Sequence, residues 1–337
     1  MCTILITGGT GYIGSHMVVK LLERNYHCVI VDNLSNSYEN VLEKIKKITD
    51  KSHLLQFHKV DITDQEALDS IMRQYTFSAC IHFAGVKAVG GSVQNPMKYY
   101  QNNVTGSYVL IDLLRKHNCK NIIFSSSSTV YGNTNSGNIL ETDPLKPVNP
   151  YGRTKRIVEG MLEDINKSEP NKWNIDILRY FNPVGAHKSG LLKENPVGTP
   201  KNLFPFVAQV YKGEKKRVHI FGNTYLTKDG TGVRDYIHVM DLIEGHFVCL
   251  ENMLKRRENK EPTLIRTYNL GTGIGTSVLE VINLFQMIGQ KKIPHSFASI
   301  RSGDVACSVC NTDKIYYELG WLAKNSVNDA IRDLLRE

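Results

Sequence analysis

The chain has 337 residues, of which 41% are hydrophobic and 22% charged, and its formal net charge at pH 7 is +8. This length and composition allow a full hydrophobic core and predict two domains, or one large sheet domain with an elaboration. No apolar run reaches the roughly 18 residues that a membrane span requires, and the positive charges are scattered among acids, which argues against nucleic-acid binding.

The N-terminal segment has the pattern of a strand, a glycine-rich turn and a helix. An apolar strand over residues 2–6 leads directly into Thr7–Gly14 (TGGTGYIG), and an amphipathic helix follows. Glycines at such a turn let a pyrophosphate approach the backbone, where the first N–H groups of the helix bind it. We therefore expect a nucleotide cofactor here, held by Gly8, Gly11, Tyr12, Ile13 and Gly14.

The next strand selects the cofactor. It covers residues 29–31 and ends at Asp32, 18 positions after Gly14, close to the ~20 residues at which a carboxylate meets the adenosine ribose. That carboxylate repels the 2′-phosphate of NADP, and the segment beginning at Asn33 supplies no arginine to offset the repulsion. NAD is therefore the expected cofactor.

Strands and helices alternate through the rest of the first half, which predicts an α/β fold with a doubly wound parallel sheet of the Rossmann type. The expected elements are helices at 39–48, 64–74, 92–117 and from 150, and strands at 53–60, 79–83, 121–124 and 175–180. Ligands bind beyond the carboxyl ends of such strands. One rim should thus carry the residues at the strand ends: Asp32, Asp61, Gly85, Ser127, Tyr180, Phe181 and Asn182.

The amino-acid composition of the chain changes after residue 180. Residues 183–235 are rich in Gly, Pro and Asn, with short helical pieces. We expect a dinucleotide-binding domain over residues 1–180 and a smaller C-terminal α/β substrate lobe over residues 181–337. The boundary is soft, and segments are expected to interleave.

The segment Pro150–Lys155 carries the second strong signal. Proline suits a helix start, and Tyr151 and Lys155 are then one turn apart on the same side. A phenol with a pKa near 10 is a poor base at pH 7, but a neighbouring ammonium and an oxidised nicotinamide stabilise the phenolate. Tyr151 is the candidate base. Ser127 is a candidate hydrogen-bond partner of the reacting oxygen, although its neighbouring hydroxyls leave that choice open.

Seven stretches carry a family resemblance that covers nearly the whole chain. They are Gly11–His16, Asp32–Leu34, His82–Gly90, Phe124–Gly132, Pro150–Lys155, Arg179–His187 and Gly230–Asp241. In them the chain resembles the UDP-galactose (UDP-glucose) 4-epimerases of the extended short-chain dehydrogenase/reductase family. The resemblance implies a redox-neutral isomerase that passes through a 4-keto sugar, with Tyr151 as base and Ser127 as its hydrogen-bond partner. It implies that Lys155 tunes the base and holds the nicotinamide ribose, so that Tyr151 and Lys155 also contact NAD.

The resemblance also implies binding residues. Expected additional contacts to NAD are Asn33, Asp61, Ile62, Phe83, Ala84, Gly85, Lys87, Asn102 and Tyr180. Expected contacts to the UDP-sugar are Phe181, Asn182, Asn202, Leu203, Phe221, Arg234, Arg301, Asp304 and Ser308. Two arginines suit a diphosphate, because a planar guanidinium engages two oxygens.

Ser308 takes the position where family members carry a bulky tyrosine or a small residue. The resemblance therefore implies a wider sugar pocket that also accepts UDP-N-acetylglucosamine and its galactosamine partner. The family commonly forms homodimers, here through helices near 92–117 and 150–168. With the first strand at residue 2, we expect no signal peptide and a cytoplasmic protein.

Three alternatives stay open. A 4,6-dehydratase of the same superfamily needs an acid pair where this chain has Ser128-Thr129. A pentose or uronate 4-epimerase is the second, because the size of the sugar pocket is hard to read from one chain. A non-catalytic NAD sensor would not need Tyr151 and Lys155. No metal is expected, because the one pair with metal or redox spacing, Cys307 and Cys310, lacks the further ligands of a zinc site.

Overall fold

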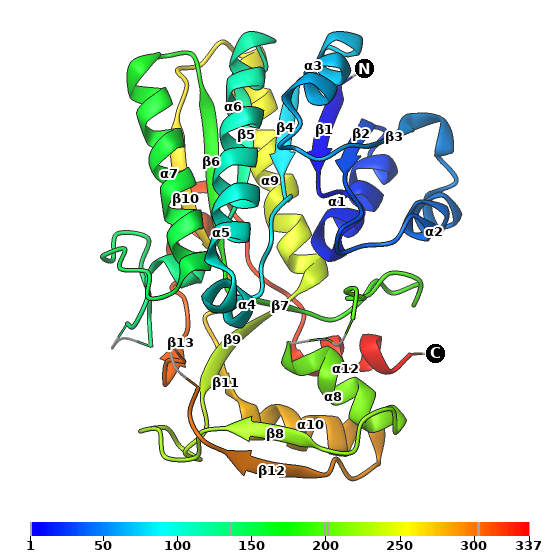
Figure 1. Cartoon of the computed structure of the whole chain (residues 1–337), viewed down its shortest axis with the longest axis vertical. Helices are drawn as coiled ribbons and strands as arrows, with labels where there is room; N and C mark the ends of the chain where they lie inside the picture. Colours follow the sequence, from blue (N-terminus) through cyan, green and yellow to red (C-terminus); the bar gives the residue numbers. More distant parts are fainter. Residues whose placement is uncertain (1, 135–136, 199, 201, 302–303, 337) are drawn as a thin grey trace. The chain divides into compact units, whose positions relative to one another are not determined.

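A computed structural model describes residues 2–134, 137–198, 200, 202–301 and 304–336 (Figure 1). The chain divides into two compact units, each built from three separate segments. Unit 1 comprises Met1–Gly132, Leu145–Arg179 and Ile243–Tyr268, and unit 2 comprises Asn133–Pro144, Tyr180–Leu242 and Asn269–Glu337. The change in amino-acid composition near residue 180 lies at one of these borders, and the segment Ile243–Tyr268 belongs to unit 1 again.

Unit 1 is built on a seven-stranded sheet with the order β10-β6-β5-β4-β1-β2-β3. The pairs β1–β2, β2–β3, β1–β4 and β4–β5 are parallel, which confirms the predicted doubly wound sheet. The strands are β1 (Thr3–Thr7), β2 (His27–Asp32), β3 (Leu55–Lys59), β4 (Ala79–His82), β5 (Asn121–Ser127), β6 (Asn174–Tyr180) and β10 (Ile265–Leu270). The edge strand β10 comes from a part of the sequence for which we predicted no sheet strand.

Helices cover both faces of this sheet, because the strand order reverses at β1 and right-handed crossovers then place the helices on opposite sides. They are α1 (Tyr12–Glu23), α2 (Asn40–Thr49), α3 (Gln65–Gln74), α4 (Val89–Gln94), α5 (Pro96–Tyr99), α6 (Gly106–Lys116), α7 (Pro150–Ser168) and α9 (Val239–Glu258). Helices α3, α6 and α7 stand side by side (Figure 1). Helix α9 contacts α1, where Lys20 bonds Glu244 at 2.5 Å.

The single long helix expected over 92–117 is corrected by the structure. Helix α4 ends at Gln94, and a new helix begins at Pro96, with the Asn95 side chain accepting the Lys98 N–H. A residue before proline is driven out of the helical region, and proline has no N–H to continue the hydrogen-bond ladder. From Pro96 the helix continues to Lys116 through a π-helical stretch, η2 (Tyr100–Thr105).

Unit 2 has a separate core and smaller sheets. Strand β9 (Val233–His238) pairs with β7 (Asn182–Val184), β11 (Gly275–Ser277) and β13 (Cys307–Ser308), while β8 (Val218–Phe221) pairs with β12 (His295–Ala298). Its helices are α8 (Leu203–Lys212), α10 (Val278–Gly289), α11 (Asp313–Leu319) and α12 (Val327–Leu335). Buried Phe204, Tyr236 and Phe285 pack together in its core.

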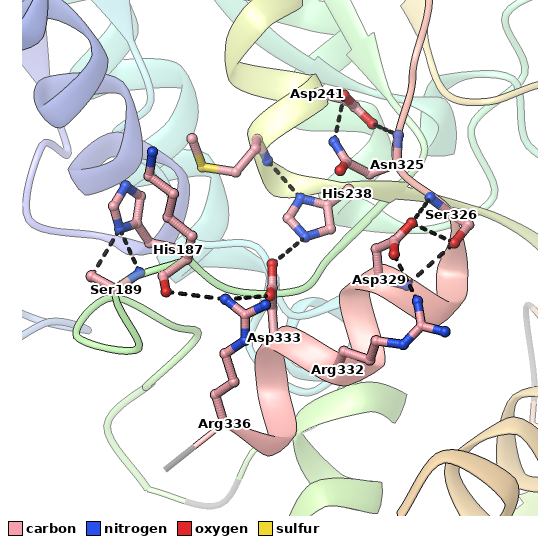
Figure 2. Close-up of polar contacts among 12 residues, drawn as sticks. His187, Ser189, His238, Asp241, Asn325, Ser326, Asp329, Arg332, Asp333 and Arg336 are labelled. Carbon is pink, nitrogen blue, oxygen red and sulfur yellow. Dashed lines mark hydrogen bonds and ion pairs between the residues drawn. The ribbon is translucent and has the colours of Figure 1, made fainter.

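Polar contacts hold the C-terminal segment of unit 2 in place (Figure 2). The buried His238 ring accepts the Met240 N–H at Nδ1 (3.1 Å), so its Nε2 carries the proton and donates it to Asp333 on α12 (3.2 Å). The Asp241 carboxylate accepts the backbone N–H of Asn325 at 2.7 Å and its side-chain amide at 2.8 Å. These residues therefore have a structural role.

Candidate active site

The glycine turn has the shape that its sequence predicts. Gly8 has a φ of +72°, and a Cβ there would lie 2.7 Å from the Ala84 nitrogen. A Cβ at Gly14 would collide with the Gly8 carbonyl oxygen. Helix α1 begins at Tyr12, and its N-cap residue Gly11 makes no side-chain cap bond. The turn is therefore a backbone cradle at a helix N-terminus that suits a pyrophosphate.

Asp32 is fixed at the end of β2. Its carboxylate accepts the N–H of Leu34 at 2.9 Å, the N–H of Thr10 at 3.1 Å and the Ser37 hydroxyl at 3.3 Å. These donors turn the carboxylate into an oriented acceptor at the strand end, in the place where a ribose diol is expected. The cradle and this acceptor together fit a dinucleotide.

Two further expected cofactor residues lie together beside Asp32. The Asn33 amide donates to Asp61 at 2.6 Å, and Thr63 donates to the same carboxylate through its N–H (2.9 Å) and hydroxyl (2.7 Å). Burial alone would raise the pKa of Asp61, but these hydrogen bonds outweigh it and lower the pKa. Asp61 is therefore a fixed anion next to the end of β2.

The loop after β4 contains the expected residues Phe83, Ala84, Gly85 and Lys87. The Lys87 ammonium lies 5.8 Å from the centre of the Tyr12 ring, which brings two predicted cofactor residues together. The buried amide beside this loop is Asn103, which bonds the Val86 N–H at 2.8 Å and the Val86 carbonyl at 3.0 Å. We had not singled out Asn103.

The neighbouring Asn102 is placed differently. Its side chain donates to the Lys98 carbonyl of its own helix at 2.9 Å. A contact of Asn102 with NAD therefore stays a prediction from the resemblance. The buried Asn103 amide also donates to the Thr154 hydroxyl at 3.0 Å, which ties the β4 loop to α7.

The catalytic candidates converge on α7 and the end of β5. The Asn149 side chain caps the helix by accepting the Gly152 N–H at 2.8 Å, with Pro150 in the first turn. Lys155 is buried and donates to the Ser125 carbonyl at 2.6 Å. Its ammonium lies 6.0 Å from the centre of the Tyr151 ring. The expected pair is thus on one side of α7.

Ser127 is oriented toward Tyr151 by its neighbours. Its oxygen accepts the Thr129 hydroxyl at 3.0 Å and the Thr129 N–H at 3.2 Å. The single proton of Ser127 is then available for its hydrogen bond to Tyr151, which lowers the tyrosine pKa. A dehydratase needs an acid at the position that Thr129 occupies in this chain.

Burial shifts both titrating groups toward their neutral forms. It raises the pKa of Tyr151 to about 12, and the Ser127 hydrogen bond only partly opposes it. It lowers the pKa of Lys155 to about 8, against the opposing effect of Glu159. In the protein alone the pKa of Tyr151 is raised, because desolvation outweighs the Ser127 hydrogen bond. A further positive charge is needed to stabilise the phenolate.

Unit 2 groups several of the residues expected to bind UDP. Arg301 donates to Asp304 at 3.0 Å, and its guanidinium carbon lies 4.3 Å from the centre of the Phe221 ring. Ser308 in β13 is the register partner of Arg234 in β9. Two local clusters therefore form. The first combines the Phe221 ring with the Arg301 cation, and the second combines the Arg234 cation with the small residue Ser308.

The remaining expected residues of unit 2 are placed as follows. The Asn202 amide donates to Glu194 at 2.7 Å, and Leu203 opens helix α8. Asn182 lies in β7 opposite Tyr236. Tyr180 and Phe181 are buried. The structure gives each of these a defined backbone position, and their contacts with a nucleotide stay predictions.

Tyr225 is a residue that the sequence reasoning missed. Its hydroxyl is buried, and no partner for it is found among the described residues. Burial and the nearby Asp304 raise its pKa, whereas Arg234 and Arg301 lower it. A polar group without a partner between charged residues has the character of a ligand contact. The sequence around Tyr225 gives no signal, because a tyrosine in a loop is common.

The cysteine pair has a structural environment. The thiol of Cys310 is buried and donates to the Asp235 carboxylate at 3.2 Å. Burial first, and Asp235 second, raise the pKa of this thiol well above its usual value. Among the described residues, no group of three or more His, Cys, Asp or Glu side chains is arranged to hold a metal ion.

Comparisons with known proteins agree with this geometry. The family described as GDP-mannose 4,6 dehydratase matches residues 5–334. A UDP-glucose 4-epimerase of Bacillus subtilis (strain 168) is 48% identical over 333 residues, covering 99% of this chain and 96% of that protein. UDP-glucose 4-epimerase 2 of Arabidopsis thaliana is 47% identical, covering 98% of this chain and 93% of that protein.

Solved structures give the same result. The UDP-glucose 4-epimerase from Bifidobacterium longum, in complex with NAD+ and UDP, has a TM-score of 0.93 and 42% identity. The match covers 99% of this chain and 97% of that one.

In the part of the chain that the structure describes, no helix combines the length and apolar character that crossing a bilayer demands.

Proposed function

The chain belongs to the UDP-glucose 4-epimerases of the extended short-chain dehydrogenase/reductase family, and from this membership we infer the roles of its residues. It is an NAD-dependent isomerase that interconverts UDP-glucose and UDP-galactose at C4 of the hexose. The observation that carries this function is the arrangement of Ser127, Tyr151 and Lys155 at the carboxyl end of β5.

The cofactor is NAD. We propose that the Gly8–Gly14 turn holds its pyrophosphate, Asp32 its adenosine ribose, and Asn33 with Asp61 the adenine side. Lys87 and Lys155 are the cations placed for the nicotinamide half. When bound, NAD+ supplies a reversible hydride acceptor for the sugar carbon and a positive charge near Tyr151. That charge opposes the burial that raises the pKa of Tyr151 to about 12.

Tyr151 is the base toward the sugar 4-hydroxyl. Its phenolate oxygen takes the O4 proton as the C4–H bond breaks, leaving a 4-keto sugar, and it returns the proton when that bond re-forms on the other face. Ser127 donates to the tyrosine oxygen and stabilises the phenolate. Lys155 contributes a fixed positive charge, since its ammonium is anchored on the Ser125 carbonyl.

The UDP moiety is assigned to unit 2. The cluster of Phe221, Arg301 and Asp304 offers an aromatic face to uracil and a guanidinium to the diphosphate. Arg234 supplies a second guanidinium. Asn182, Asn202 and Leu203 complete the set by the family resemblance.

The experiment that tests this function follows UDP-galactose incubated with the purified protein and no added NAD. We expect formation of UDP-glucose, because the cofactor stays bound, and a loss of about 100-fold to 10,000-fold in rate for Tyr151→Phe. A 4-keto-6-deoxy product would instead show a dehydratase, and bound NAD without turnover would show a sensor. Undiminished turnover by Tyr151→Phe would refute the assignment of the base.

We propose that the enzyme also epimerises UDP-N-acetylglucosamine. The support is Ser308, a small residue whose β13 position pairs with Arg234, one of the residues expected to hold UDP. Ser308→Tyr should remove activity on the N-acetyl sugars and keep activity on UDP-galactose. If the wild type does not turn over the N-acetyl sugars, this extension is wrong.

We propose a cytoplasmic homodimer. Support for the dimer comes from apolar side chains exposed on α4, α5, α6 and α7, where Val93, Met97, Tyr108 and Ile157 are 63%, 72%, 58% and 39% exposed. An exposed apolar surface of this kind is typical of an interface. Light scattering after size-exclusion chromatography should give twice the chain mass for the wild type and a single chain for Met97→Glu with Tyr108→Glu.

A further inference from the structure

Three successive serines at the end of β5 contact three residues spaced one turn apart on α7. Ser127 bonds Tyr151, the Ser125 carbonyl accepts from Lys155 at 2.6 Å, and the Ser126 hydroxyl donates to Glu159 at 2.5 Å. Positions four residues apart lie on one side of a helix. Glu159 is thus part of the same row as the catalytic pair, although the proposed reaction does not use it.

Glu159 is a fully buried carboxylate held by a fork of hydrogen bonds. Arg179 on β6 donates to it through Nε (3.0 Å) and Nη2 (2.9 Å), and Glu159 is 0% exposed. Arg179 is itself held by the Tyr131 hydroxyl at 2.9 Å. A buried ion pair adds little net stability compared with apolar residues of the same size. Stability therefore does not explain why the Glu159–Arg179 pair lies beside Lys155.

The groups around Lys155 show which charge matters. The titratable and charged groups that face Lys155 and Glu159 are Tyr151 and Arg156 on α7, His82 on β4, Tyr99 on α5, Tyr131 after β5, and Arg179 on β6. His82 is neutral, because burial first and Lys155 second lower its pKa to about 3. Among Lys155, Glu159 and the groups that face them, Glu159 is the anion, and it lies one helical turn from Lys155.

We propose that Glu159 is a positioning residue for the epimerase reaction, which keeps Lys155 charged beside Tyr151 while Arg179 and Ser126 fix the carboxylate. Burial drives the lysine toward the neutral amine, and Glu159 opposes this, so that the ammonium persists at the working pH. A neutral Lys155 could not stabilise the Tyr151 phenolate. The ion pair is therefore retained for its effect on the reacting pair.

The inference rests on the proposed function and is tested by the pH dependence of kcat on UDP-galactose. Loss of the ammonium sets the alkaline limb of the profile. In Glu159→Gln we expect this limb to move to lower pH by about one unit, so that kcat at the alkaline end falls about tenfold while KM is unchanged. The acid limb should stay in place.

A double variant keeps the test decisive if the single variant does not fold. Glu159→Gln leaves the Arg179 charge buried without its partner, which is strongly destabilising. Glu159→Leu with Arg179→Met removes both charges and keeps the volume, and it should shift the alkaline limb in the same direction by a smaller amount. If Glu159→Gln does not fold, the double variant decides.

The matched control is a second buried ion pair of unit 1. Arg266 donates to Asp176 through two bonds of 2.8 Å, and Asp176 is on the same strand as Arg179. Asp176→Leu with Arg266→Met should change the melting temperature without moving either limb. An unshifted alkaline limb in folded Glu159 variants, or an equal shift in the control, would overturn the inference. An inactive wild type would instead overturn the proposed function.

Discussion

The candidate catalytic residues of unit 1 and the Phe221–Arg301 cluster of unit 2 are held in opposite ways. In unit 1, Lys155 and Ser127 are 5% and 8% exposed, and hydrogen bonds fix both of them. In unit 2, Phe221 is 38% exposed, and the Arg301 side chain, 56% exposed, is bonded to a near neighbour in the sequence. Proton transfer needs dry, rigid surroundings that set a pKa, whereas a group that grips a ligand has to be reachable.

This difference predicts a split in the kinetics. Substitutions among the buried residues of unit 1 should act on kcat and on its pH dependence. Substitutions in the exposed clusters of unit 2 should act on KM and on nucleotide binding. Each prediction below concerns one side of the comparison between the two sets of residues.

The largest effect is expected for Lys155→Met. Burial raises the pKa of Tyr151 to about 12, and removing the buried ammonium takes away a positive charge that favours the phenolate. The value of kcat should fall about 100-fold to 10,000-fold, with KM nearly unchanged. The control is Lys167→Met, the same substitution at the exposed end of α7. A rise in KM as large as the fall in kcat would place Lys155 with the ligand-binding residues and contradict the comparison.

Arg301→Leu should show the opposite pattern. Loss of a charged hydrogen-bond donor to a diphosphate should raise KM and the Kd for UDP about 10-fold to 100-fold, with kcat little changed. Isothermal titration with UDP measures the Kd directly. Arg217→Leu, at an exposed arginine just before β8, is the control. A drop in kcat alone would contradict the assignment.

The buried side of the comparison should also govern acid stability. The pKa of His82 is about 3 in the folded state, mainly through burial, and about 6.5 in the unfolded chain. Between these values only the unfolded chain binds the proton, so stability falls as the pH falls from about 6.5 toward about 3, by up to about 1.4 kcal/mol per pH unit.

Urea unfolding at several pH values measures this slope. In His82→Asn the slope should be shallower across the same window, whatever the change in absolute stability. His219→Asn, at an exposed histidine of β8, should keep the wild-type slope. A wild-type slope in His82→Asn would show that other groups cause the acid sensitivity.

The smallest effect is expected for Tyr225→Phe. If the buried hydroxyl meets the nucleotide, its loss should raise KM about 3-fold to 10-fold, the range of one neutral hydrogen bond, with kcat unchanged. Tyr316→Phe, at an exposed tyrosine of α11 in the same unit, is the control. An unchanged KM would leave Tyr225 as a packing residue against Gly222.

Local patterns predicted much of the fold and the centre of the candidate site. The Gly8–Gly14 turn, the strand ending at Asp32 and the spacing of Tyr151 and Lys155 each depend on residues close in the chain. Backbone conformation, helix periodicity and capping act over such short distances, so these features can be read from the residues alone. The helix break at Asn95-Pro96 is also a local signal, and the helix predicted over 92–117 does not take it into account.

The contacts between distant residues follow from the packing of the folded chain. The pairing of Glu159 with Arg179, the amide of Asn103 beside Val86, and the return of β10 to the sheet join segments 17 to 90 positions apart. No local pattern encodes these contacts, because they arise when a helix and several strands are packed into one core. The identity and local spacing of the reacting groups are therefore readable from the residues, whereas packing sets their burial and the neighbours that control their charge.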